Sequence, residues 1–308
     1  MRWPPKHLYE LKSVTRLVDP KYTGARFDPV AIKVWICSRC GHELLKGPLI
    51  GAHSETCRRA RREAVVVDRL RPLWDFQDFE LSDRNLRAQL EREPDDAGRA
   101  EVLTQLARLE GVRGHFDVGD RLLDEAEELA GESEVVAVRV ALERGRLRLS
   151  GGNRSAARPL FVTAFERALV AGESYIAGDA AHMAAIADED VRDWTARGLE
   201  LAERDPAAAY WRGTLLHNLG WWHQERGEHA KALIAFEGAL AAREREPAHE
   251  FLIEFAHHAL AVALRALGRN DEALAHAEHA VAWADRTGTS APDFRETLAS
   301  LRAEHADA

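Results

Sequence analysis

The chain has 308 residues, of which 46% are hydrophobic and 30% charged, so it is long enough for about two domains with a sizeable core. No apolar run reaches the ~18 residues of a membrane span, and the first residues lack the apolar stretch of a secretion signal. The three cysteines are an odd number, which argues against a secreted disulfide framework. We therefore expect a cytoplasmic protein that does not contact a membrane.

The net charge of −9 conceals an uneven distribution along the chain. Residues 1–72 contain 15 Lys or Arg and 7 Asp or Glu, whereas the remainder contains 27 and 44. A basic N-terminal region therefore precedes an acidic body. Two interpretations stay open. The two parts attract each other, within one chain or between the chains of a homo-oligomer, or the basic region binds an anionic partner such as nucleic acid.

The basic region, which we assign to residues 1–64, contains all three cysteines within the segment CSRCGHELLKGPLIGAHSETC, residues 37–57. The pattern Cys-x2-Cys-x12-His-x3-Cys has the ligand spacing of a small zinc module. The four ligands would be Cys37, Cys40, His53 and Cys57. A strand formed by KVWIC would present the first thiolate, and His53 and Cys57, four residues apart, would share one face of a helix. A shell closed by four protein ligands is typical of structural rather than catalytic zinc.

This segment resembles the two-Cys, two-His zinc finger, with cysteine in place of the last histidine. The resemblance would place Lys46, Leu49 and Ala52 at the positions that read DNA bases. Leucine and alanine cannot form paired hydrogen bonds to purines, so we do not expect sequence-specific recognition. One alternative is a nucleic-acid-associated regulator whose basic region holds phosphates only. Another is that residues 1–64 are an upstream translation foreign to the natural protein.

Residues 65–95 are predicted to form a linker and an N-terminal cap helix for the acidic body. The stretch LRPLWDFQDFELSDRNLRAQL contains four large apolar side chains, those of Leu73, Trp74, Phe76 and Phe79. An open end of a helical stack would expose apolar surface, so we expect these side chains to cover it. Ser82 is a candidate N-cap for the helix that follows.

Residues 96–308 show apolar positions at helical spacing, broken by short turns. In the clearest segment, residues 215–247, the order of small, turn and large residues resembles the tetratricopeptide repeat. The residues that carry the resemblance are Leu219, Gly220, Gly227, Ala232, Phe236 and Ala239. Residues 102–130, 141–169 and 257–284 repeat the pattern, and residues 177–206 are a degenerate version.

The predicted fold class is therefore all-α, a tetratricopeptide-repeat-like α-solenoid of about five helix pairs plus a cap helix, joined to a small ββα-type zinc module. The stretch APDFRETLASLRAEH, residues 291–305, would be the C-terminal cap helix. The alternative for the helical part is an unrelated bundle.

In the family that these repeats resemble, the first helix of each pair lines a groove that usually binds a peptide or protein segment. Carrying the family's groove positions onto this sequence gives Arg108, Arg139, Arg146, His217, Trp221, Gln224, His258 and Arg265. The set contains no paired carboxylates, and its arginines favour an acidic peptide or a C-terminal carboxylate. Because Trp221 and Trp222 are adjacent, they are expected to point to different faces.

The sequence offers no sign of catalysis in the repeat region. It contains no HExxH pair, no phosphate-binding glycine loop and no nucleophile elbow, and its histidines are expected to be scattered over the surface. We predict a non-enzymatic interaction scaffold with structural Zn²⁺. An enzyme with catalytic zinc is a third hypothesis, and it would need an open coordination position on the metal.

Overall fold

The computed structural model describes residues 9–17, 29–37, 43–44, 68–244 and 250–306. The chain divides into two units, Met1–Val65 and Val66–Ala308. The zinc-ligand prediction falls largely outside the described residues: Cys37 is the last residue of a strand, and Cys40, His53 and Cys57 lie in ranges that are not described.

The N-terminal unit contains a three-stranded antiparallel sheet. Its strands are β1 (Tyr9–Leu17), β2 (Pro29–Cys37) and β3 (Glu43–Leu44), in the order β1-β2-β3. Trp35 pairs with Leu44 and Ile36 with Glu43, so β2 and β3 form an antiparallel pair, and Cys37 is the last residue of β2. The stretch KVWIC is part of β2, as the sequence predicts.

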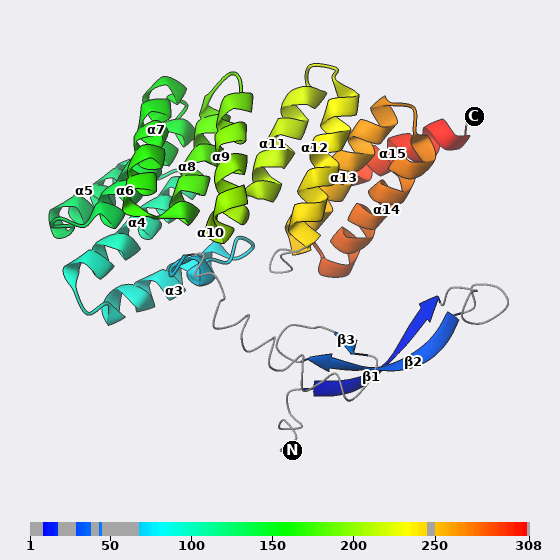
Figure 1. The fold of residues 1–308 in the computed structure, drawn as a ribbon, viewed down its shortest axis with the longest axis horizontal. Helices are drawn as coiled ribbons and strands as arrows, with labels where there is room; N and C mark the ends of the chain where they lie inside the picture. The colour runs from blue at the N-terminus through cyan, green and yellow to red at the C-terminus, as the bar shows by residue number, and fades with distance from the viewer. Residues whose placement is uncertain (1–8, 18–28, 38–42, 45–67, 245–249, 307–308) are drawn as a thin grey trace. The chain divides into compact units, whose positions relative to one another are not determined.

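The second unit is helical (Figure 1). It begins with the short helix η2 (Arg71–Leu73) and the helix α3 (Phe79–Arg92). Five helix pairs follow: α4 (Asp96–Val112) with α5 (Phe116–Leu129), α6 (Glu134–Ser150) with α7 (Arg154–Ala171), α8 (Ser174–Ala187) with α9 (Arg192–Arg204), α11 (Arg212–Gln224) with α12 (His229–Glu244), and α13 (Glu250–Ala266) with α14 (Asn270–Thr287). The short α10 (Pro206–Ala209) precedes the fourth pair, and α15 (Pro292–Ala306) closes the array. In the described part of the chain, no helix combines the length and apolarity that crossing a membrane requires.

Small residues allow the two helices of a pair to approach closely, as the repeat pattern predicts. A Cβ atom added to Gly220 of α11 would lie 2.3 Å from the ring of Phe236 on α12. In the same way, a Cβ atom added to Gly145 of α6 would lie 2.5 Å from the ring of Phe161 on α7. Gly227, between α11 and α12, has φ +71°, a left-handed conformation that glycine adopts without strain. These contacts explain why the sequence specifies helix pairs.

The buried apolar residues form three clusters along the array. Trp222 packs against the cluster that extends from α6 to α11, whereas Trp221 packs against the one formed by α12 to α15. The two adjacent tryptophans therefore point to different sides of α11. Both are partly buried, so each contributes to a core and neither is a fully exposed anchor.

The helix α3 begins differently from the prediction. Its N-cap is Asp78, whose carboxylate accepts a hydrogen bond from the Leu81 N–H at 2.8 Å. Ser82 is a buried residue inside the helix, and its Oγ accepts a hydrogen bond from the Asp75 N–H at 2.8 Å. Ser82 is thus not the cap, because it lies inside the helix and the carboxylate of Asp78 takes the capping position at the Leu81 N–H. Its hydroxyl instead fixes the turn before the helix.

Candidate binding site on the inner face

The first helices of successive pairs, α4, α6, α8, α11 and α13, contact one another along the array. This contact places them together in one layer, which we call the inner face. All eight predicted groove residues lie on these first helices. The structure therefore collects the predicted residues on one layer, and the remaining question is which of them are available to a ligand.

A strap of residues 68–76 crosses the inner face at its N-terminal end. Its Leu70 is only 1% exposed, and the Trp74 indole Nε1–H donates to Gln105 of α4 at 3.0 Å. Further along, Arg71 donates to the Tyr210 hydroxyl at 3.1 Å. The strap thus contacts α4 of the first helix pair and the turn that precedes α11.

Arg139 holds the strap and is therefore not a free groove residue. Its guanidinium lies 2.7 Å from Asp68 of the strap and 3.1 Å from Glu101 of α4, and the side chains of Arg139 and Asp68 are only 8% and 5% exposed. Burial opposes the charge on Arg139, but the two carboxylates outweigh it and raise the pKa of the guanidinium. The ion pair fixes the strap to α6.

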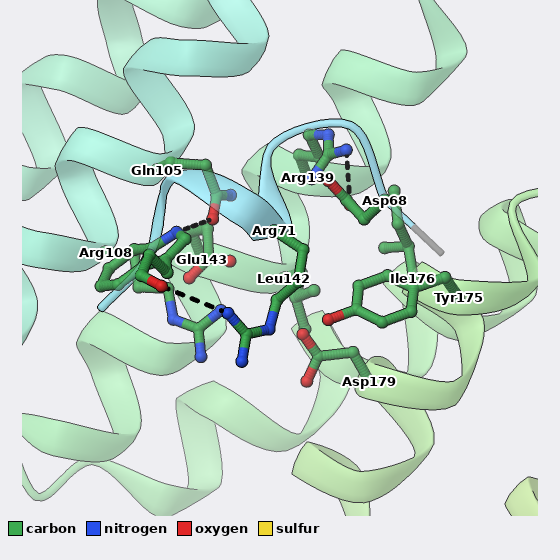
Figure 2. A pocket seen from close by; sticks show the side chains of 11 residues that line it. Asp68, Arg71, Gln105, Arg108, Arg139, Leu142, Glu143, Tyr175, Ile176 and Asp179 are labelled. Atoms are coloured by element: carbon green, nitrogen blue, oxygen red, sulfur yellow. Dashed lines mark hydrogen bonds and ion pairs between the residues drawn. The ribbon is translucent and has the colours of Figure 1, made fainter. Parts of the chain in front are cut away.

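A pocket lies beside the strap on the inner face (Figure 2). Its empty volume is about 310 Å³, which includes some open solvent at its mouth. Its lining residues come from the strap, α4, α6 and α8: Asp68, Arg71, Trp74, Gln105, Arg108, Arg139, Leu142, Glu143, Tyr175, Ile176 and Asp179. Figure 2 shows the guanidinium groups of Arg71 and Arg108 beside each other in this pocket.

Arg108 differs from the other arginines of the inner face. Its guanidinium carbon lies 5.0 Å from the Trp74 ring centroid and 5.7 Å from that of Phe76, within cation–π range. In the parts of the chain that the structure describes, no hydrogen-bond acceptor or carboxylate pairs with it. Burial, and then the neighbouring positive charge of Arg146, lower the pKa of Arg108. The pocket therefore presents a guanidinium held by aromatic rings, with its N–H donors unpaired.

Two buried carboxylates that are not among the predicted groove residues, Glu143 and Asp179, lie on the same wall. Arg146 forms ion pairs with Glu143 of its own helix, at 3.0 Å, and with Asp179 of α8. Burial raises the pKa of Glu143, whereas for Asp179 the charge of Arg146 overcomes the effect of burial and lowers the pKa. Arg146 is thus paired internally, and the carboxylates hold α6 against α8.

Two predicted groove residues near the C-terminus, His258 and Arg265, also contact side chains of the chain itself. Arg265 forms a bidentate ion pair with Glu304 of α15, at 3.0 Å and 3.2 Å from Nε. The His258 ring lies against Phe294 of the same helix and within 3.0 Å of the Thr297 hydroxyl. The cap helix α15 therefore covers the inner face of α13, which the sequence pattern of single repeats does not reveal.

His217, Trp221 and Gln224 form a polar row on α11. The Trp221 indole donates to His217 Nε2 at 3.0 Å, so the imidazole proton is on Nδ1. Burial lowers the pKa of His217 to about 3, and this ring is neutral at pH 7. Gln224 Oε1 lies 3.0 Å from His229 Nδ1 of α12. These three residues stay partly exposed and can contact a segment lying along the inner face.

Comparison with known proteins supports the assignment of the repeats. Residues 212–246 and 258–282 match the family model described as Tetratricopeptide repeat. No curated protein matches the chain by sequence.

Two solved structures share the arrangement of helices. The first is a Signal Transduction ATPase with Numerous Domains (STAND) protein with a tetratricopeptide repeat sensor from Pyrococcus horikoshii: 17% identity, TM-score 0.56, with 81% of this chain and 36% of that chain covered. This chain thus corresponds to about a third of that protein. The second is BtubC (BKLC) from P. vanneervenii, at 18% identity and TM-score 0.53, with 70% of this chain and 91% of that chain covered. The described helices of the second unit have the fold of a tetratricopeptide-repeat solenoid.

Proposed function

We propose that this protein is a non-enzymatic scaffold that binds a segment of another protein along the inner face of its solenoid. The observation that carries the proposal is Arg108, whose guanidinium lies in a pocket and lacks a described acceptor. A guanidinium binds carboxylates through charge-assisted hydrogen bonds, so the partner segment would place an acidic side chain or its C-terminal carboxylate there. The polar row on α11 would contact another part of the same segment.

The other arginines of the inner face have a structural role in this proposal. Arg139, Arg146 and Arg265 are each engaged by carboxylates of the chain itself. A ligand carboxylate would have to compete with these pairs, whereas at Arg108 it would meet unpaired donors. The acidic residue of the partner is therefore assigned to Arg108 alone.

Replacing Arg108 by glutamine should weaken binding of an acidic segment roughly 10- to 100-fold, because a hydrogen bond to a charged group contributes about 1.5–3 kcal/mol. An array of acidic peptides and their amide counterparts identifies a binding sequence, and fluorescence anisotropy then measures its affinity for each variant. The matched control is Arg121→Gln, on the exposed side of α5. Equal affinity of both variants for the peptide would exclude the pocket as the acidic subsite.

We further propose that Cys37, Cys40, His53 and Cys57 hold one structural zinc ion. The pairing of β2 with β3 supports this, because Cys37 ends β2 and Cys40 follows it in the sequence between the two paired strands, a position from which a knuckle presents two thiolates together. Three thiolates and one imidazole are a donor set that suits Zn²⁺. The ion would stabilise the N-terminal unit, which has few residues for a core of its own.

Elemental analysis of the purified full chain should find one zinc per chain, and Cys37→Ser should lose it. His42→Asn is the matched control, because His42 is the remaining imidazole of the segment and is not one of the proposed ligands. Retention of zinc by Cys37→Ser, or its loss from His42→Asn, would overturn this assignment of ligands.

A further inference from the structure

Three histidines from two helices come together where α13 packs against α14. His257 lies on α13, and His276 and His279 lie one turn apart on α14. The ring centroid of His257 is 5.0 Å from that of His276 and 4.0 Å from that of His279. The sequence predicts scattered surface histidines in this region, so the cluster is a finding of the structure.

The contact between His257 and His276 joins two nitrogens of the same kind. Their Nδ1 atoms are 2.8 Å apart, so one carries the proton that the other accepts. If both protons move to Nε2, which leaves the rings neutral, two Nδ1 lone pairs face a common point. A metal ion can then take the place of the shared proton without any net release of protons.

We propose that His257 and His276 are the protein ligands of a divalent transition-metal ion bound at this point. Imidazole nitrogen suits Zn²⁺, Ni²⁺ and Cu²⁺. With metal–nitrogen bonds of about 2.0–2.1 Å, the two nitrogens of a tetrahedral site are roughly 3.3 Å apart, so the rings need to separate by about 0.5 Å. Both rings are partly exposed, and this movement does not disturb the core.

The surroundings of the pair keep both rings neutral, as metal binding requires, because burial lowers the pKa of His257 to about 4 and also lowers that of His276. The His279 ring stacks on His257 and is itself held by Glu254, whose Oε2 lies 2.9 Å from His279 Nδ1. The negative charges of Glu272 on α14 and Glu237 on α12 offset part of the effect of burial on His276. His279 is thus a positioning residue, because a carboxylate fixes its ring against a ligand.

The described residues contain no group of three or more His, Cys, Asp or Glu side chains placed to enclose a metal. The proposed site is therefore open, with two protein ligands and the remaining coordination positions filled by solvent. Such a site exchanges its metal readily, unlike the closed four-ligand zinc site proposed for the N-terminal unit.

Calorimetric titration with Ni²⁺ tests the proposal, using the full chain with Cys37→Ser, Cys40→Ser and Cys57→Ser so that thiolates do not compete. We expect one Ni²⁺ per chain, and a Kd that rises more than roughly tenfold in His257→Ala and in His276→Ala, because even outer-shell partners change affinity about 10- to 100-fold. His115→Ala is the control, since His115 is exposed and lies far along the chain on a different helix pair. Unchanged Ni²⁺ affinity in His257→Ala and His276→Ala, or an equal loss in His115→Ala, would overturn the proposal.

A second measurement does not depend on how the variants fold. The electron paramagnetic resonance spectrum of Cu²⁺ bound to the same cysteine-free chain should show coupling to two imidazole nitrogens. Coupling to one nitrogen only, or to none, would contradict a site shared by His257 and His276.

Discussion

Phe236→Ala is expected to lower the free energy of unfolding of the helical unit by about 4 kcal/mol, because removing a buried phenylalanine side chain costs about 3–5 kcal/mol. Phe236 is 0% exposed, and its ring lies against the backbone of Gly220 on the facing helix. Glycine has no side chain that could move into the space, so the cavity would stay open. Denaturant unfolding followed by far-UV circular dichroism measures the change.

The same helix provides a matched control for this prediction. Ile234 is also a large apolar residue of α12, but it is 70% exposed. Ile234→Ala should change the free energy of unfolding by less than about 0.5 kcal/mol, the usual range for surface substitutions. If the two alanine variants lose similar stability, the pair of Gly220 and Phe236 is not what holds α11 to α12.

Arg139→Met should cost about 3–5 kcal/mol, because removing one partner of a buried ion pair leaves the other charge uncompensated. The charge left behind is that of Asp68, whose side chain is 5% exposed. Glu101, which also pairs with Arg139, would then be a second carboxylate near it without this guanidinium. We expect the strap to leave the inner face, and limited proteolysis near residue 70 should then be faster. Chemical denaturation gives the size of the loss.

Arg204→Met is the control for this second prediction. Arg204 pairs with Glu200 on the exposed side of α9, where the side chains are 72% and 59% exposed. Exposed pairs contribute about 0–1 kcal/mol, so the two methionine variants should differ by several-fold in their loss of stability. A loss in Arg139→Met as small as in Arg204→Met would show that the strap is held by its apolar residues rather than by the ion pair.

The helix pairs were predictable because their determinants are local in the sequence. Gly220, Ala232 and Phe236 lie within 17 residues of each other and define one pair through contacts that the repeat pattern encodes. The positions of the groove residues on the first helices follow from the same pattern. These features depend on the helical period and on the sizes of neighbouring side chains, both of which can be read along the chain.

The availability of the groove residues was not predictable, because it depends on segments that return from elsewhere. Asp68 reaches Arg139 across 71 positions, and Glu304 reaches Arg265 across 39. No motif or regular spacing in the sequence identifies Asp68 or Glu304 as the partner of an inner-face arginine. The histidine cluster was missed for a similar reason, since His257 and His276 belong to different helices and meet only when α13 and α14 pack.

The two tryptophans of α11 have a mechanical consequence. In a linear array each repeat contacts only its neighbours, so the two apolar clusters that flank α11 are joined through this helix. Trp222 fastens the helix to one cluster and Trp221 to the other, so a rotation of α11 about its axis would loosen both. Bending of the solenoid at this point would therefore disturb the packing of both clusters. We expect α11 to transmit such a movement from one half of the helical unit to the other.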